Sequence, residues 1–192
     1  TALGKYMAHL HDPNELINAI WAGTKAMIKN DGSQTNEAVF WHTYCSIFGK
    51  NAKSDEAVLE KFYRTRYIEL RAMCSAHPDL DPFIKGLKAK GIKLAVATNP
   101  LFPLFVQEER ISWTGADPRD FDRITCYENS HYSKPNPAYY AEILEIGRDN
   151  GSSCNILWPA GCSFLCKRPV RRNILYRRGG KISAGMAGGS EL

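Results

Sequence analysis

Three side chains near the middle of the sequence have types and positions suited to binding an anion: Thr98, Asn99 and Lys134. Thr98 and Asn99 directly follow the apolar run 92–97, which is typical of a parallel strand buried on both faces. Doubly wound folds bind their ligands beyond the carboxyl ends of such strands. Lys134 follows a second candidate strand and would bring an ammonium group to the same edge. The spacing therefore predicts a site for a phosphate-sized anion, the alternative being that Thr98 and Asn99 only cap a helix while Lys134 is solvated.

From residue 76 onward, helices and short apolar strands are expected to alternate, as they do in a doubly wound parallel sheet. The elements predicted are a helix with Asp81 as its N-cap that ends at Gly91, the strand at 92–97, a helix from Asn99-Pro100 to about Arg110, a strand within 123–127, a helix from Asn136-Pro137 to about Gly147, and a strand beginning at 156–158. The N-terminal amides of the helix after Asn99 would add hydrogen-bond donors to the anion site.

Residues 1–75 show helical periodicity and no convincing strand. Thr35 and Ser54 are predicted N-caps, and Gly49 is a predicted helix end. We therefore expect an α/β fold in which an all-helical unit (1–75) precedes a truncated, Rossmann-like sheet core (76–158).

The composition fits a soluble globular chain and excludes general disorder, with 44% hydrophobic and 23% charged residues among 192. The net charge of +5 arises entirely from residues 155–192, which contain seven Lys or Arg residues and one Glu. We expect this basic tail (159–192) to be poorly ordered. No apolar run is long enough to span a membrane. Six cysteines are too few for a disulfide scaffold, which favours the cytoplasm.

Two segments carry a resemblance to a known family. KLAVATNP at 93–100 and SKPNPAYY at 133–140 resemble the second and third motifs of haloacid dehalogenase-like (HAD) hydrolases, and the helices before them resemble the cap of these enzymes. The resemblance implies a phosphatase-type reaction on a small phosphorylated metabolite, with an aspartate nucleophile and Mg²⁺. Thr98 and Asn99 would bind the phosphoryl group, and Lys134 would be a catalytic residue that offsets negative charge.

The sequence departs from the family at two places. The nucleophile motif, Asp-x-Asp followed by Gly-Thr, belongs on a strand before the cap and is not found there. Asp79-Leu80-Asp81 has the spacing, but it precedes a helix, and we interpret Asp81 as the cap of that helix. Residues 150–190 contain no Asp or Glu to bind the metal. We therefore expect a catalytically incomplete chain, a fragment without the first strand and with an aberrant C-terminus.

Other functions stay open. Dehalogenation of a small haloacid would use the same nucleophile without a metal. The basic tail favours a non-enzymatic nucleic-acid-binding or interaction protein, although it lacks a known reading motif and nucleic acid is the less favoured partner. The oligomeric state is left open.

The remaining candidate ligands are interpreted as structural. We expect His9 and His11 at surface positions, His42 on an exposed helix face, and His131 near the loop of Lys134. Trp21, Trp41 and the aromatic stripe of 58–68 are expected in the core. We expect no zinc site at Cys154, Cys162 and Cys166, because their spacing does not suit one.

Overall fold

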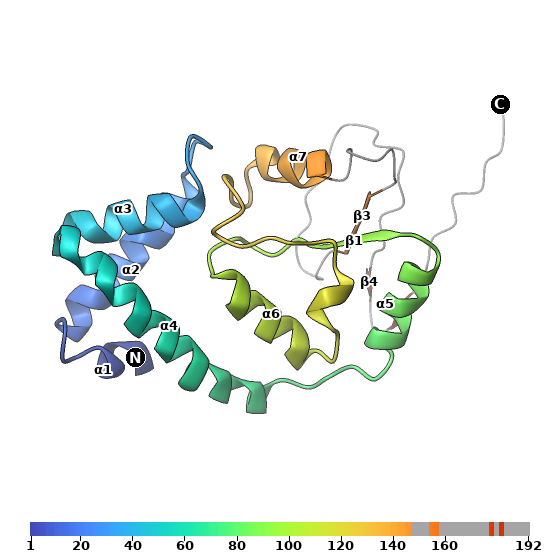
Figure 1. Ribbon diagram of the computed structural model, residues 1–192, viewed down its shortest axis with the longest axis horizontal. Coiled ribbons are helices and arrows are strands. Elements are labelled where there is room, and N and C mark those ends of the chain that lie inside the picture. Colours follow the sequence, from blue (N-terminus) through green and yellow to red (C-terminus); the bar gives the residue numbers. More distant parts are fainter. Residues whose placement is uncertain (147–153, 158–176, 179–180, 183–192) are drawn as a thin grey trace.

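The computed structural model describes residues 1–146, 154–157, 177–178 and 181–182. Figure 1 shows a group of helices on one side of the molecule and a small sheet with its own helices on the other. Within the basic tail, β4 (Arg177–Arg178) and β5 (Lys181–Ile182) pair as antiparallel strands. The rest of the predicted tail, including Cys162 and Cys166, lies outside the described residues. None of the described helices has the length and apolarity needed to cross a membrane.

Residues 2–73 form a helical unit. Its elements are α1 (Ala2–Tyr6), α2 (Pro13–Ile28), α3 (Asn36–Phe48), η1 (Lys50–Ser54), α4 (Asp55–Thr65) and η2 (Tyr67–Met73), where η marks a 3-10 helix. Thr35 caps α3 as predicted, because its side chain accepts a hydrogen bond from the Ala38 amide at 3.2 Å. Ser54 precedes α4, but its hydroxyl donates to the Asn51 carbonyl and caps nothing. Gly49 ends α3 with a φ of 92°, which suits a residue without a side chain.

Helices α2 and α3 approach each other closely at Gly23. A Cβ atom at this position would lie 2.5 Å from the Phe40 ring, so only glycine lets that ring pack against the α2 backbone. The buried cluster around this contact comprises Met7, Leu16, Ala19, Met27, Phe40, Trp41, Tyr44, Ala52, Leu59 and Tyr127. Tyr127 follows the second strand of the sheet, so the helical unit and the sheet share part of one core.

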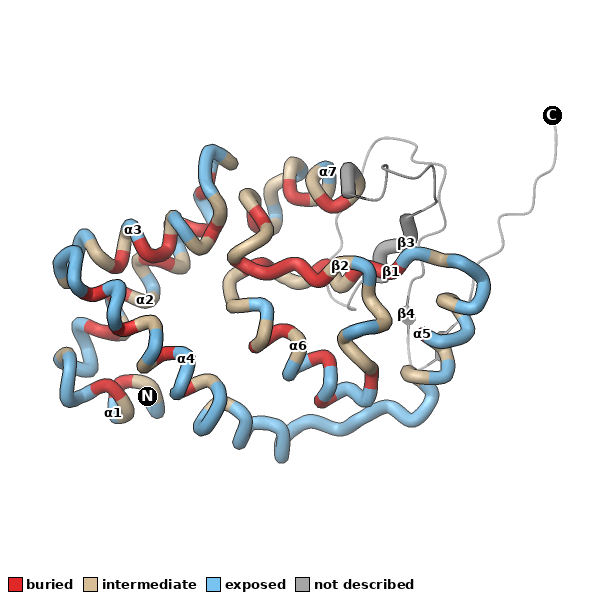
Figure 2. The backbone as a smooth tube through the Cα atoms, in the orientation of Figure 1, coloured by how far each residue is buried: buried red, intermediate tan, exposed pale blue. Residues whose placement is uncertain are grey.

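The sheet has three parallel strands in the order β2-β1-β3. The central strand is β1 (Lys93–Val96), which pairs with β2 (Arg123–Ile124) on one side and β3 (Cys154–Leu157) on the other. The predicted strands at 92–97 and 123–127 are present, and the third begins two residues earlier than predicted. Figure 2 shows the buried backbone of this region running through the centre of the α/β part.

Helices cover both faces of the sheet. On one face, Leu94 of β1 packs with Ile84 of α5 (Leu80–Ala89) and Ile111 of α6 (Leu104–Trp113). On the other face, Ala95 and Ala97 pack against α7 (Pro137–Ile146). Successive residues of a strand point to opposite faces, so these alternating contacts place β1 between two helical layers. The fold is α/β and doubly wound, as expected from the sequence.

The prediction that Asp81 caps α5 is wrong. The helix begins at Leu80, and the Leu80 amide donates to the His77 carbonyl at 3.1 Å, so the first turn forms before Asp81. The Asp81 carboxylate accepts from Lys85 at 2.7 Å, one helical turn later. Pro82 lies within the first turn, where its missing amide costs no intrahelical hydrogen bond.

The predicted helix from Asn99 is also wrong at its start, because α6 begins only at Leu104. A residue before proline is disfavoured in the helical conformation, and prolines at positions 100 and 103 impose this restriction on Asn99 and Phe102. The segment from Asn99 to Pro103 is therefore a connection that leads away from the carboxyl end of β1.

Candidate functional site

The loop after β1 and the loop before α7 meet at the carboxyl edge of the sheet. The Lys134 amide donates to Asn99 Oδ1 at 3.1 Å, and Lys134 Nζ donates to the Ala97 carbonyl at 2.8 Å. Ala97 and Asn99 flank Thr98, so the structure brings together the three residues that the sequence singled out. All three are partly exposed and thus within reach of a small ligand. Their role in binding an anion stays a prediction.

Two hydroxyl groups that sequence analysis missed hold the backbone of Thr98. Thr125 Oγ1 donates to the Thr98 carbonyl at 2.8 Å, and the Tyr139 hydroxyl donates to the same oxygen at 2.5 Å. Both side chains are buried, and burial raises the pKa of the Tyr139 phenol, so this group stays a hydrogen-bond donor near neutral pH. Tyr139 lies one helical turn before Ile143 on the face of α7 that packs on the sheet, and this periodicity is the signal that marks it as buried.

Asn36 links the helical unit to both loops of the site, and nothing in the sequence pattern indicated this role. Its side chain is fully buried, and Nδ2 donates to the Pro100 carbonyl and to Ser133 Oγ, both at 3.2 Å. Its Oδ1 accepts from Asn30 Nδ2 at 2.9 Å. Because Pro100 follows Asn99 and Ser133 precedes Lys134, the start of α3 fixes the spacing between the two loops.

The N-terminus of α6 does not contribute to the anion site, contrary to expectation. Helix α6 begins five residues after Asn99, and both carboxylate oxygens of Glu128 lie 3.0 Å from the Leu104 amide. A helix N-terminus attracts negative charge through its free amides. Here a side chain of the protein already supplies that charge, so the amide is not available to a second anion.

One aspartate of each Asp-x-Asp pair among the described residues is held by a partner away from this edge. Asp81 pairs with Lys85 on α5. A second pair with the same spacing, Asp120-Phe-Asp122, was not considered from the sequence. The Asp122 carboxylate accepts from the Leu94 amide at 2.9 Å and forms an ion pair with Lys93, both at the start of β1. Asp122 therefore lies at the amino edge of the sheet, opposite Thr98.

The side chains described do not fit the Mg²⁺ ion that the resemblance implies. Magnesium requires oxygen ligands in near-octahedral geometry, usually including one or two carboxylates. Among the described residues, no group of three or more His, Cys, Asp or Glu side chains is placed to hold a metal ion. This part of the chain therefore offers no support for a catalytic step through a metal.

The histidines have different environments. His9 and His42 are exposed, as expected. The expectation for His11 is wrong: its Nε2 lies 2.5 Å from Asp55 Oδ2, and its ring stacks on Phe48. Asp55 is buried, and a buried carboxylate needs polar partners, which places His11 against the core. His131 contacts Glu142 at 2.7 Å, in the loop that precedes Lys134.

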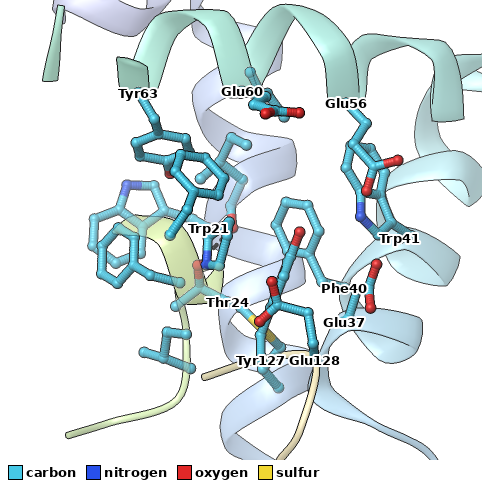
Figure 3. Close-up of a pocket in the computed structure, with 17 residues that line it drawn as sticks. Trp21, Thr24, Glu37, Phe40, Trp41, Glu56, Glu60, Tyr63, Tyr127 and Glu128 are labelled. Atoms are coloured by element: carbon cyan, nitrogen blue, oxygen red, sulfur yellow. Dashed lines mark hydrogen bonds between the residues drawn. The ribbon is translucent and has the colours of Figure 1, made fainter. Parts of the chain in front are cut away.

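A separate cavity of about 530 Å³ lies between the helical unit and the segments that follow β1 and β2. Figure 3 shows side chains of α2, α3 and α4 facing those of the two connecting segments. Thr98, Asn99 and Lys134 do not line it. The expectation that Trp21 lies in the core is wrong, because Trp21 is 59% exposed and forms part of the cavity wall. Trp41 is buried as expected and borders the same cavity.

Comparison with known proteins agrees with the motifs. Residues 6–150 match the family model of haloacid dehalogenase-like hydrolases. No curated protein and no solved structure gave a match. The matched range contains the helical unit from α2 onward, β1, β2 and both loops of the candidate site. With about three quarters of its length matched, the chain belongs to the haloacid dehalogenase-like hydrolases.

Proposed function

We propose that Thr98, Asn99 and Lys134 bind the phosphoryl group of a small phosphorylated metabolite, so that the chain is a phosphatase-type member of its family. The observation that carries this proposal is the pair of hydrogen bonds from Lys134 to Ala97 and Asn99. They hold a cationic side chain beside the residue whose hydroxyl the motif assigns to the phosphoryl group.

Each residue has a distinct part in this proposal. Lys134 offsets the negative charge of the phosphoryl group, and a hydrogen bond between ionised partners is stronger than a neutral one. Thr98 donates its hydroxyl to a phosphoryl oxygen. Asn99 acts on Lys134, because its Oδ1 accepts the Lys134 amide and thereby fixes the loop. The buried hydroxyls of Tyr139 and Thr125 hold the Thr98 backbone in place through its carbonyl oxygen.

We further propose that the chain binds the phosphoryl group without completing its hydrolysis. Hydrolysis in this family requires a carboxylate that attacks phosphorus and forms an aspartyl-phosphate. Asp81 and Asp122, which belong to the two described Asp-x-Asp pairs, are engaged by Lys85 and by the start of β1. The arrangement therefore supports oxyanion binding more directly than turnover.

The binding part is tested with orthovanadate, a tetrahedral analogue of phosphate, by isothermal titration calorimetry. Lys134→Met keeps the apolar stem and removes the charge, so we expect affinity to fall about tenfold or more. Lys61→Met, at an exposed position of α4, is the matched control and should bind like the unchanged chain. Thr98→Val provides a second variant with nearly unchanged shape. Equal vanadate affinity in all four proteins would contradict the proposal.

The catalytic part is tested with p-nitrophenyl phosphate and Mg²⁺. We expect no turnover above that of the Lys134→Met variant. If the unchanged chain turns over and Lys134→Met abolishes this activity, the phosphoryl site stands, but the proposal that the chain does not complete hydrolysis is wrong. Release of chloride from 2-chloropropionate without added metal would favour the dehalogenase alternative over the phosphatase.

A further inference from the structure

The cavity between the helical unit and the sheet connections has the size of a ligand site. Its volume of about 530 Å³ lies within the range usual for sites that bind small molecules. Three helices of the helical unit form one side of its wall, and two connecting segments with the start of α6 form the other, so the cavity lies at the junction of two parts of the molecule (Figure 3). Thr98, Asn99 and Lys134 are not among its lining residues, so the inference of a ligand in this cavity does not rest on the proposed function.

Aromatic rings form much of the wall. Trp21 of α2, Trp41 of α3 and Tyr63 of α4 face the cavity from the helical unit, and Phe105 and Tyr127 face it from the sheet side. Aromatic faces carry partial negative charge and attract cations, most strongly when water is excluded. Trp21 is the most exposed of these residues, so its ring is accessible from solvent.

Four carboxylates border the same space: Glu37, Glu56, Glu60 and Glu128. Burial raises the pKa of Glu37, and the charges of Glu128 and Glu56 add to this effect, while Lys53 opposes it. Glu37, Glu56 and Glu128 thus repel one another, although Lys53 lies 3.8 Å from Glu37 and 2.8 Å from Glu56. One lysine offsets only part of this repulsion, and a bound cation would relieve the rest.

Two cations of the protein itself already combine with rings and carboxylates of this wall. Lys53 Nζ lies 4.2 Å from the centre of the Trp41 ring and 2.8 Å from Glu56. The Arg64 guanidinium lies 4.3 Å from the centre of the Phe105 ring, and its partner is Glu60 at 2.8 Å. Rings and carboxylates of this wall thus already hold cations together, and the four carboxylates of the wall outnumber the two cations paired with them.

One buried polar atom in the wall is poorly satisfied. Trp41 is 6% exposed, and its Nε1 forms no hydrogen bond of normal geometry. It lies near enough to the Tyr127 phenol to lower the pKa of that group, although burial raises this pKa by more. Buried donors are rarely left in this state unless a water or ligand completes them. This observation is independent of the carboxylates and points to a water bound in the cavity, which would accept from Trp41 Nε1 beside an occupant that has no acceptor atom of its own.

We propose that this cavity binds a small organic cation, an ammonium group attached to an apolar or aromatic body. The ammonium would lie among the carboxylates of Glu37, Glu56 and Glu128, and the apolar body would pack on the rings of Trp21 and Tyr63. A neutral molecule of the same shape gains only the apolar contacts, and an anion is repelled.

The test uses the full chain and three probes of similar shape, measured by calorimetry: phenyltrimethylammonium, tert-butylbenzene and benzenesulfonate. We expect the cation to bind about tenfold more tightly than the neutral probe, with no binding of the sulfonate. Equal affinity for the cation and the neutral probe would reduce the cavity to an apolar one and overturn the proposal. Failure of all three probes to bind would overturn it as well.

Two variants locate the binding. Trp21→Ala removes a largely exposed ring, and Glu37→Gln keeps the shape of the side chain while removing its charge. Each should weaken cation binding several-fold, whereas Glu109→Gln, at an exposed position of α6 outside the cavity, should leave it unchanged. Circular dichroism checks the fold of each variant. Cation binding that both Trp21→Ala and Glu37→Gln leave intact would place the cation elsewhere and contradict the proposal. Lys134→Met, which tests the phosphoryl site, should not affect it.

Discussion

The carboxyl edge of the sheet and the cavity beside the helical unit are two candidate binding regions with different construction. At the sheet edge, Thr98 and Lys134 are positioned by hydrogen bonds to main-chain atoms, namely the carbonyls of Ala97 and Thr98 and the amide of Lys134. The cavity is bounded by side chains from five segments, and its shape depends on how the helical unit packs on the sheet.

Because of this difference, the two regions should tolerate different side-chain substitutions. A site held by hydrogen bonds from a few side chains to the main chain keeps its geometry when other neighbouring side chains change, provided that the bonding side chains, the strand and its loops stay in place. A cavity bounded by packed side chains changes shape when one ring or one helix contact changes. Substitutions at the junction should therefore affect both regions, and substitutions within either region should affect that region alone.

The largest effect is expected at the junction, from Asn36→Ala. This change leaves Ser133 Oγ without its partner in a buried environment, removes one of the two hydrogen bonds of Asn30 Nδ2, and removes the side-chain links from α3 to both site loops. We expect a loss of about 2–4 kcal/mol in the free energy of unfolding, because several buried polar groups lose hydrogen bonds together. Urea denaturation measures the loss, and vanadate and phenyltrimethylammonium affinities should both fall.

Asn18→Ala is the matched control for that prediction, because Asn18 is exposed on α2. It should change the unfolding free energy by less than about 0.5 kcal/mol. Loss of vanadate binding in Asn36→Ala with unchanged binding of the organic cation would show that the two regions do not depend on a common junction.

A smaller effect is expected at the sheet edge from Tyr139→Phe. The ring still packs on Ala95 and Ala97, but the Thr98 carbonyl retains only the hydrogen bond from Thr125. We expect a loss of about 1 kcal/mol, typical of one hydrogen bond. Thr125→Val should have a similar effect, and the double variant should lose more than the sum, since the carbonyl is then left without either hydroxyl. Strict additivity in urea denaturation would show that the two hydroxyls do not share this role.

The sequence predicted the parts of the molecule that depend on local patterns. The apolar run at 92–97 was enough to predict β1, and the order of the two motifs was enough to place Thr98 and Lys134 near one another. Asn36 and His11 were missed or misread because their partners are far along the chain. The Asn36 side chain contacts Pro100 and Ser133, which lie 64 and 97 positions further along the chain. No periodicity within α3 indicates such contacts.

The errors at helix starts have a different cause. Asp81 and Asn99 both precede proline, a pattern that often opens a helix. At Asp81 the first turn had already formed through His77, and at Asn99 the side chain is used by the Lys134 amide. A side chain that is held by a partner elsewhere in the fold does not cap the helix that follows it, and the sequence does not say which partner lies close in the fold.

The smallest effect expected is a pH dependence confined to the cavity. Phenyltrimethylammonium carries a permanent charge, so any change of affinity with pH arises from the protein.

Burial and the charges of Glu128 and Glu56 raise the pKa of Glu37 against the opposing effect of Lys53. Glu37 should therefore become protonated at a higher pH than an ordinary glutamate. Its neutral form does not attract the cation, so affinity should fall as the pH is lowered through that raised pKa, by the factor that Glu37→Gln causes at neutral pH. The variant itself should show a weaker dependence on pH, because it lacks the Glu37 carboxylate. Calorimetric titrations at a series of pH values decide the point: an identical pH profile in Glu37→Gln would remove Glu37 from the cation site, and affinity that rises on acidification would contradict a site built on carboxylates.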